Sequence, residues 1–214
     1  MMHLITGKRK ESGTTEEQRR DAMSVHEDLK FVQRAQKDRK AAAELIARLA
    51  PRVKHAVYLA VGKDEEADDL THVCLVEILE NLGSYRGTGS LEGWAGQLSY
   101  RVLMRYLSRR RRSERTVSLV PIDPGISLVN PERDTQRGRL RAKLAAHLRK
   151  LPEERRIALI LRLVYQHSVA EVAELTGAPV NTVRDRLRVG LKELRQSILR
   201  DPETREFLGE ERHG

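Results

Sequence analysis

The chain has 214 residues, enough for one large domain or two small ones. Its formal net charge of +9 favours a polyanionic partner wherever that charge gathers on one face. Charged residues make up 33% and aromatic residues 4%, which favours an all-α fold over sheets. The only cysteine, Cys74, excludes an intramolecular disulfide and fits a reducing compartment. Because the apolar runs are too short to span a bilayer and the N-terminus carries no export signal, we expect a cytoplasmic protein.

The first half of the chain is predicted to be helical from about residue 24. Residues 1–23 lack apolar periodicity and are predicted to be a disordered extension. Asp38 is a candidate N-cap for a long helix with an apolar stripe, and Gly62 is a candidate stop at its end. Pro51 falls inside this stripe and indicates either a kink in one helix or a break between two.

A further helix is predicted to begin at Asp64, and its first turn, through Asp69, is unusually acidic for a basic chain. The carboxylates either compensate the helix dipole on a solvated surface or form a docking surface for a basic partner. Cys74 lies between Val73 and Val76 in an apolar stretch, and we interpret it as a core residue rather than a reactive thiol.

The next predicted helix follows a polar loop from Gly83 to Ser90, and Ser90 is its candidate N-cap. The loop is a weak phosphate-binding candidate because it lacks the residues that end a P-loop. The helix combines aromatic rings with arginines, and single-stranded nucleic acid requires this pairing of stacking platforms and phosphate contacts. The alternative is a core role for the aromatics and a solvated helix end for the arginines. We favour the core for Trp94 and nucleic-acid binding for Arg109 to Arg112.

Residues 113–138 interrupt the helical pattern with prolines, which predicts an irregular linker between two small helical domains. Its apolar residues lead us to expect that it packs against a partner. Helical periodicity resumes at residue 139 and continues to about residue 200, with Pro152 as the candidate first residue of one helix. The charged segment 201–214 is predicted to be a fraying tail.

A helix-turn-helix is predicted within this second domain. Ser168 and Glu171 have the spacing of a capping box, and Gly177 suits the left-handed position that ends the first helix. Pro179 prevents that helix from continuing, and Thr182 is the candidate N-cap of the second helix.

The second of these two helices has an apolar stripe opposite a basic face. The stripe consists of Val183, Leu187, Leu191, Leu194 and Ile198. The basic face carries Arg184, Arg186 and Arg188. A polar, basic N-terminal half is typical of the helix that reads DNA in such motifs. Taken alone, the stretch also fits an ordinary helical hairpin with a solvated charged face.

Six short motifs follow one another along roughly residues 27–200. They are Glu66-Ala67-Asp68-Asp69-Leu70, Tyr85-Arg86-Gly87, Trp94 with Arg109 to Arg112, Leu151-Pro152-Glu153-Glu154-Arg155-Arg156, Glu171-Val172-Ala173-Glu174 and Thr182-Val183-Arg184-Asp185-Arg186-Leu187. No single motif is specific, but in this order and at this spacing they resemble a sigma factor of the extracytoplasmic-function (ECF) type. That type is the minimal two-domain form of the bacterial sigma-70 family. The resemblance implies a region 2-like domain over 24–112, a linker over 113–138 and a region 4-like helix-turn-helix domain over 139–200.

The resemblance also implies core RNA polymerase and promoter DNA as partners, and an anti-sigma factor as a further candidate. Polymerase docking would fall to Asp68, Asp69, Leu70 and His72. The melted −10 strand, with a base flipped from the stack, would contact Tyr85, Arg86, Trp94, Tyr100, Arg101, Arg105, Arg109, Arg110 and Arg111. The duplex −35 element would contact Asn181, Thr182, Arg184, Asp185, Arg186 and Arg188. The linker would run along the active-site channel of the polymerase.

The sequence departs from the family pattern in two places. The family usually has glutamine and an acidic residue where this chain has His72 and Val73. It usually has asparagine and aspartate where this chain has Arg101 and Arg105, so we expect tighter and less selective binding of the melted strand.

Two other classes of protein compete with this interpretation. A self-sufficient helix-turn-helix regulator would bind a palindromic duplex as a dimer without polymerase. A DNA-processing enzyme would need a nucleophile or a metal site, but the seven histidines have no zinc-ligand spacing and the acidic residues are not arranged as metal ligands. We therefore expect no enzymatic activity, no metal and no cofactor.

Overall fold

The structure is a computed structural model that describes residues 25–62, 64–116 and 136–205. These ranges are almost entirely helical and contain no strand, which confirms the all-α prediction. A first helix occupies residues 25–35. It is followed by α2 (Arg39–Val61), α3 (Asp64–Glu80), the 3-10 turn η1 (Leu82–Ser84), α4 (Leu91–Thr116), α5 (Gln136–Arg149), α6 (Glu153–Leu163), α7 (Val169–Thr176) and α8 (Val180–Leu199). The extension predicted over 1–23 lies outside the described residues.

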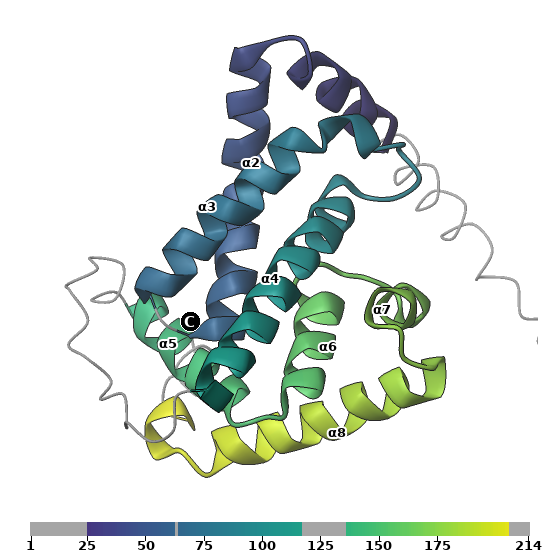
Figure 1. Ribbon diagram of the computed structural model, residues 1–214. Coiled ribbons are helices and arrows are strands. Elements are labelled where there is room, and N and C mark those ends of the chain that lie inside the picture. Colours follow the sequence, from purple (N-terminus) through teal and green to yellow (C-terminus); the bar gives the residue numbers. More distant parts are fainter. Residues whose placement is uncertain (1–24, 63, 117–135, 206–214) are drawn as a thin grey trace, which may run out of the picture.

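Helices α2, α3 and α4 pack together as the first half of the molecule (Figure 1). The carboxylate of Asp38 accepts a hydrogen bond from the N–H of Lys40 at 2.9 Å, so the predicted N-cap of α2 is confirmed. Gly62 ends the helix with a φ of 71°, in the left-handed region that glycine adopts without strain. Between these ends α2 is a single helix that contains Pro51, which decides between the two alternatives left open for that proline.

The ends of the predicted linker are helical. Ser90 caps α4 as predicted, because its hydroxyl accepts a hydrogen bond from the N–H of Gly93 at 3.1 Å. From there α4 continues to Thr116, and α5 begins at Gln136, so both helices enter the range expected for the linker. Residues 117–135 lie outside the described residues.

Helices α5 to α8 form the second half, and α8 runs across the ends of α4, α5 and α6 in Figure 1. It lies close to α6 at Gly190, where an added Cβ would be 3.2 Å from a methyl carbon of Leu159. The apolar stripe of α8 is therefore confirmed only in part. Val183 and Leu187 are buried, whereas Leu191 is 46% exposed, because α6 packs against the side of α8 that carries Gly190.

The segment after α8 is more ordered than a fraying tail. His147 of α5 is 3% exposed, and its two ring nitrogens hydrogen bond with Ser197 at 2.8 Å, Asp201 at 3.1 Å and Thr204 at 3.2 Å. These bonds hold a short helical turn, residues 202–205, against α5. The prediction for 201–214 is thus wrong for its first residues, since a buried histidine supplies partners for them. Residues 206–214 lie outside the described part of the chain.

The two halves are packed on each other. All six residues from Ala56 to Val61 at the end of α2 are buried, because this helix contacts α3 and α4 as well as α5 and α6. One continuous cluster of buried apolar side chains therefore joins both halves. On its rim, the guanidinium of Arg141 lies 4.9 Å from the centre of the Tyr58 ring, a cation–π contact between α5 and α2.

Candidate nucleic-acid interface

The turn between α7 and α8 has the predicted geometry. The N–H of Glu171 donates to the hydroxyl of Ser168 at 3.2 Å, and the N–H of Ser168 donates to the Glu171 carboxylate at 2.7 Å, so the capping box is complete. Burial alone would raise the pKa of Glu171, but these hydrogen bonds lower it. Gly177 ends α7 with a φ of 64°, as expected for a left-handed C-terminal position. The predicted helix-turn-helix is therefore present.

The start of α8 differs from the prediction. Thr182 is not the N-cap, because α8 begins at Val180 and Pro179 occupies the capping position with a φ of −57°. No side chain caps this end. Proline lacks an N–H and its fixed φ suits entry into a helix, so the helix begins directly after it. Asn181 and Thr182 consequently lie in the first turn of α8 rather than before it.

Polar side chains cover the outer face of this first part of α8. Asn181, Thr182, Arg184, Asp185 and Arg188 are exposed, and Arg186 is half-buried. Arg184 donates to the amide oxygen of Asn181 at 2.9 Å, and Arg188 pairs with Asp185 at 3.1 Å. Val183 and Leu187 hold the opposite side in the core. The six residues predicted for the −35 element are thus together on one helix, and we name its exposed side the α8 reading face.

The polar loop before α4 borders a cavity of about 210 Å³. Tyr85 is 5% exposed and donates its hydroxyl to the carbonyl of Gly89 at 2.8 Å, which holds the loop closed on itself. Its ring lies 5.5 Å from the Trp94 ring, and the Trp94 indole N–H donates to the hydroxyl of Ser84 at 3.1 Å. Burial raises the pKa of Tyr85 to about 12. Trp94 is half-buried at the edge of this cavity, so it is neither a full core residue nor a free platform.

The other residues predicted for the −10 strand lie along α4 and its preceding loop. Arg86, Arg101 and Arg109 are exposed. Three further arginines are held by carboxylates: Arg105 by Glu77 at 2.6 Å, Arg110 by Glu66 at 3.4 Å and Arg111 by Glu153 of α6. Tyr100 does not stand on this open surface. It lines the contact between α4 and α6, where burial raises its pKa.

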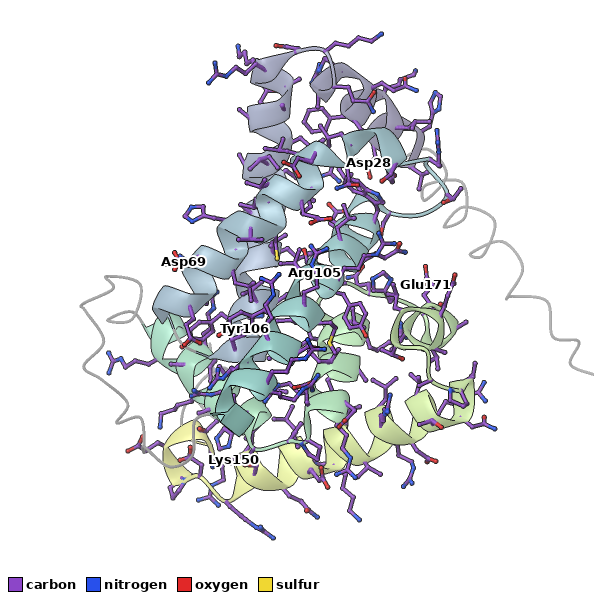
Figure 2. All side chains as sticks on the ribbon, viewed as in Figure 1. Asp28, Asp69, Arg105, Tyr106, Lys150 and Glu171 are labelled. Carbon is purple, nitrogen blue, oxygen red and sulfur yellow. The ribbon has the colours of Figure 1, made fainter. Side chains whose placement is uncertain are left out.

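The four residues of α3 predicted for polymerase docking do not share one exposed surface. Asp69 and His72 are exposed, and Asp69 lies on the side of α3 turned away from α4 (Figure 2). Asp68 is paired with Lys54 of α2 at 3.1 Å. Leu70 is 6% exposed and belongs to the core, so its assignment as a docking residue is wrong.

Two valines of α3 were missed as surface residues. Val73 is 52% and Val76 51% exposed, although the sequence placed them in an apolar stretch around the buried Cys74. They lie three residues apart and share the exposed side of α3 with Asp69 and His72. We name these four residues the α3 surface. In the sequence, Asp69, Val73 and Val76 follow one another at spacings of four and three residues. This spacing places them on one face of a helix, and it was the signal available for an exposed apolar strip.

Comparison with known proteins decides what these surfaces belong to. The family described as sigma-70 region 2 matches residues 45–113, and the family described as sigma-70 region 4 matches residues 141–194. The first match contains the α3 surface and the loop and helix around Trp94, and the second contains the α8 reading face. The chain belongs to the sigma-70 family.

The similar proteins indicate that this sigma factor is of the ECF type. It is 30% identical to the ECF RNA polymerase sigma factor SigE of Mycolicibacterium smegmatis over 161 residues, which cover 72% of this chain and 60% of that protein. It is 24% identical to the RNA polymerase sigma-H factor of Pseudomonas aeruginosa over 191 residues, which cover 84% of this chain and 99% of that one. The fold resembles the sigma factor RpoE of Bartonella quintana in complex with the anti-sigma factor NepR, with a TM-score of 0.60 and 17% identity over 76% of this chain and 99% of that chain.

Membership of this family also decides between the competing classes. Sigma factors are initiation factors without enzymatic activity that direct RNA polymerase to promoters, so this chain is an alternative sigma factor and not a DNA-processing enzyme. In the described ranges, no histidine, cysteine and carboxylate side chains gather in a group that could hold a metal ion. None of the helices described here is long and apolar enough to cross a membrane.

Proposed function

We propose that three surfaces of this sigma factor bind three different partners. The α3 surface docks on core RNA polymerase, the loop from Tyr85 to Ser90 and α4 bind the melted −10 strand, and the α8 reading face binds the −35 duplex. The division follows the two domains expected over 24–112 and 139–200. Its place of action is the cytoplasm.

The observation that carries the proposal is the exposed reading face of α8. Arg184 and Arg188 are positioned along the helix by Asn181 and Asp185, and guanidinium groups read guanine through two hydrogen bonds in the major groove. Behind this face, Arg155 of α6 pairs with Glu193 through both carboxylate oxygens, at 2.6 and 2.8 Å. This ion pair and the close packing of Gly190 on Leu159 position the reading helix against α6.

The proposal for the −10 strand rests on the cavity beside Trp94. The cavity has an aromatic wall from Tyr85 and Trp94 and polar groups from the loop, a combination suited to a flipped base. Arginines continue from it along α4, and a positively charged surface of this kind binds a phosphate backbone. Arg101 and Arg105 stand where the family usually has asparagine and aspartate, so the strand is bound more by charge than by base identity.

The docking proposal rests on the chemistry of the α3 surface. Two half-exposed valines flanked by Asp69 and His72 form an apolar strip with a polar rim, which is the composition of a protein interface. A partner with apolar side chains and a basic residue near Asp69 fits this strip. We also propose an anti-sigma factor as a partner, since the sigma factor RpoE was solved in complex with one.

Transcription in vitro tests the proposal. Core RNA polymerase is incubated with a library of promoter fragments with and without the chain, and initiated transcripts are sequenced. Initiation that depends on the chain, and promoter choice that changes in Arg184→Ala, would support the assignment of α8. A chain that footprints a palindromic duplex without polymerase and adds no initiation would contradict it and favour a self-sufficient regulator.

A further inference from the structure

Two residues between α6 and α7, Tyr165 and His167, insert into the first half of the molecule and are 3% and 2% exposed. Together with the exposed Gln166 between them they are termed the wedge. They meet α4 at two glycines three residues apart on one helix face. A Cβ added at Gly96 would lie 2.5 Å from Cγ of Tyr165, and one added at Gly93 would lie 3.6 Å from Cε1 of His167. The absence of a side chain at Gly96 therefore makes room for the Tyr165 ring, whereas a Cβ at Gly93 would be in ordinary van der Waals contact with His167.

The wedge is held in a conformation that is unfavourable in itself. Gln166 has a φ of 61°, and among the described residues it is the non-glycine residue with a positive φ. Such a residue persists only where its surroundings impose it, and here it turns two neighbouring side chains toward α4. The Nε2 atom of His167 is buried and has no hydrogen-bond partner in the part of the chain that the structure describes. Both features oppose the packed state, and the contacts of the wedge with α4 outweigh them.

The wedge forms one wall of the cavity to which the −10 base was assigned. Tyr165, Gln166 and His167 line the same 210 Å³ cavity as Tyr85 and Trp94. Arg86 from the loop and Glu171 from α7 border it as the charged groups, and Glu171 lies on the α7 side in Figure 2. The contact between α4 and α6 also contains a small cavity of about 10 Å³, which Tyr100 and Tyr165 line. A strand entering the larger cavity would therefore meet the wedge.

The other two functional surfaces stay accessible while the wedge is packed. The α8 reading face is exposed apart from the half-buried Arg186, and the α3 surface lies on the outer side of its helix. The two halves of the chain thus close one nucleic-acid surface and leave the second open.

We propose that the wedge is an intramolecular plug, which shuts the −10 pocket of the free sigma factor while leaving the α8 reading face and the α3 surface available. This proposal rests on the assignment of that pocket to the −10 strand. The strand binds only the fraction of molecules whose wedge is released, so its apparent dissociation constant is the intrinsic one divided by that fraction. Polymerase and the −35 duplex can engage before the plug opens.

Gly96→Ala is the variant that tests the plug. Alanine favours a helix more than glycine does, so α4 itself is not weakened, but the new methyl group overlaps the Tyr165 ring. Overpacking of this kind shifts the equilibrium toward the released state by about ten-fold or more. Leu199→Ala is the control, because Leu199 is 52% exposed at the end of α8, outside the wedge and the loop that borders the cavity. Tyr165→Ala breaks the same contact by removing the ring instead of adding a methyl group to α4. A result shared by both variants therefore does not come from a fold defect specific to Gly96→Ala.

Two readouts on the free protein separate the plug from the pocket assignment. Acrylamide quenching of Trp94, the only tryptophan, reports release of the wedge, and anisotropy of a short fluorescein-labelled single-stranded DNA of random sequence reports access for a strand. We expect Gly96→Ala and Tyr165→Ala to raise the quenching and to tighten DNA binding by about ten-fold, with Leu199→Ala unchanged.

The outcomes that overturn the proposal are distinct. Unchanged quenching in both wedge variants would show that no plug exists, even if the wild-type chain supports initiation with core polymerase. Increased quenching without any gain in DNA binding would show that the wedge does not guard a strand site. A wild-type chain that gives no initiation with core polymerase would instead point to failure of the proposed function.

Discussion

The α3 surface gives the prediction whose magnitude follows most directly from the structure. Replacing Val73 and Val76 by alanine removes two methyl groups from each, worth about 0.8 kcal/mol per group on going from full exposure to full burial. The valines are 52% and 51% exposed, so about half of that gain is left to be made on docking. The double variant should therefore lose about 1.6 kcal/mol of binding free energy. Its dissociation constant from core RNA polymerase should rise about fifteen-fold.

Equilibrium binding of labelled protein to core RNA polymerase measures this change. Leu199→Ala is the matched control, since Leu199 is 52% exposed at the far end of α8 and outside the proposed interface. Thermal melting of both variants checks that the fold is intact, which half-exposed positions should allow. If the double variant and Leu199→Ala bound core polymerase as tightly as the wild type, the α3 surface would not be the docking site.

Three further predictions concern reading, stability and pH. Arg184→Ala should weaken binding by about 1–3 kcal/mol at particular −35 base pairs, and a uniform loss across a duplex panel would argue against base readout. Arg48→Ala removes the guanidinium that holds the buried carboxylate of Asp28 at 2.6 Å, so urea denaturation should show a loss of about 2–3 kcal/mol in unfolding free energy. Burial lowers the pKa of His167, against the opposing effect of Glu171, so the packed wedge favours the neutral ring. Its stability is full above pH 6.5 and falls as the pH drops below that value, so tryptophan quenching should rise between pH 7.5 and pH 5.5 and rise less in His167→Gln.

Local signals in the sequence were sufficient where a helix end depends on its own side chains. Asp38, Ser90 and the Ser168–Glu171 box each satisfy N–H groups within three residues of themselves, so their geometry needs no tertiary context. The start of α8 was misplaced because two rules competed there. A capping hydroxyl at Thr182 favoured a later start, and the fixed φ of Pro179 imposed an earlier one.

Burial was harder to predict, because it depends on which helices cover a given face. Leu70 and Val73 are both apolar and three residues apart, yet α2 and α4 cover the first and leave the second exposed. The apolar run from Ala56 to Val61 was recognisable as too short for a membrane. An uninterrupted apolar run at a helix end is also typical of a segment that other helices cover on all sides. Residues Ala56 to Val61 are such a segment, buried between the two halves.

The ion pairs of α4 connect strand binding to release of the wedge. Arg105 and Arg110 are held by carboxylates of α3, whereas Arg111 is held by Glu153 at the start of α6, in the other half of the chain. Pairs this exposed contribute at most about 1 kcal/mol each, so a phosphate group can replace each carboxylate at small cost. A strand that takes Arg111 from Glu153 removes a contact that keeps α6, and with it the wedge, against α4. Strand capture and opening of the plug therefore favour each other, and a polymerase that presents melted DNA to α4 would open the sigma factor without a separate opening signal.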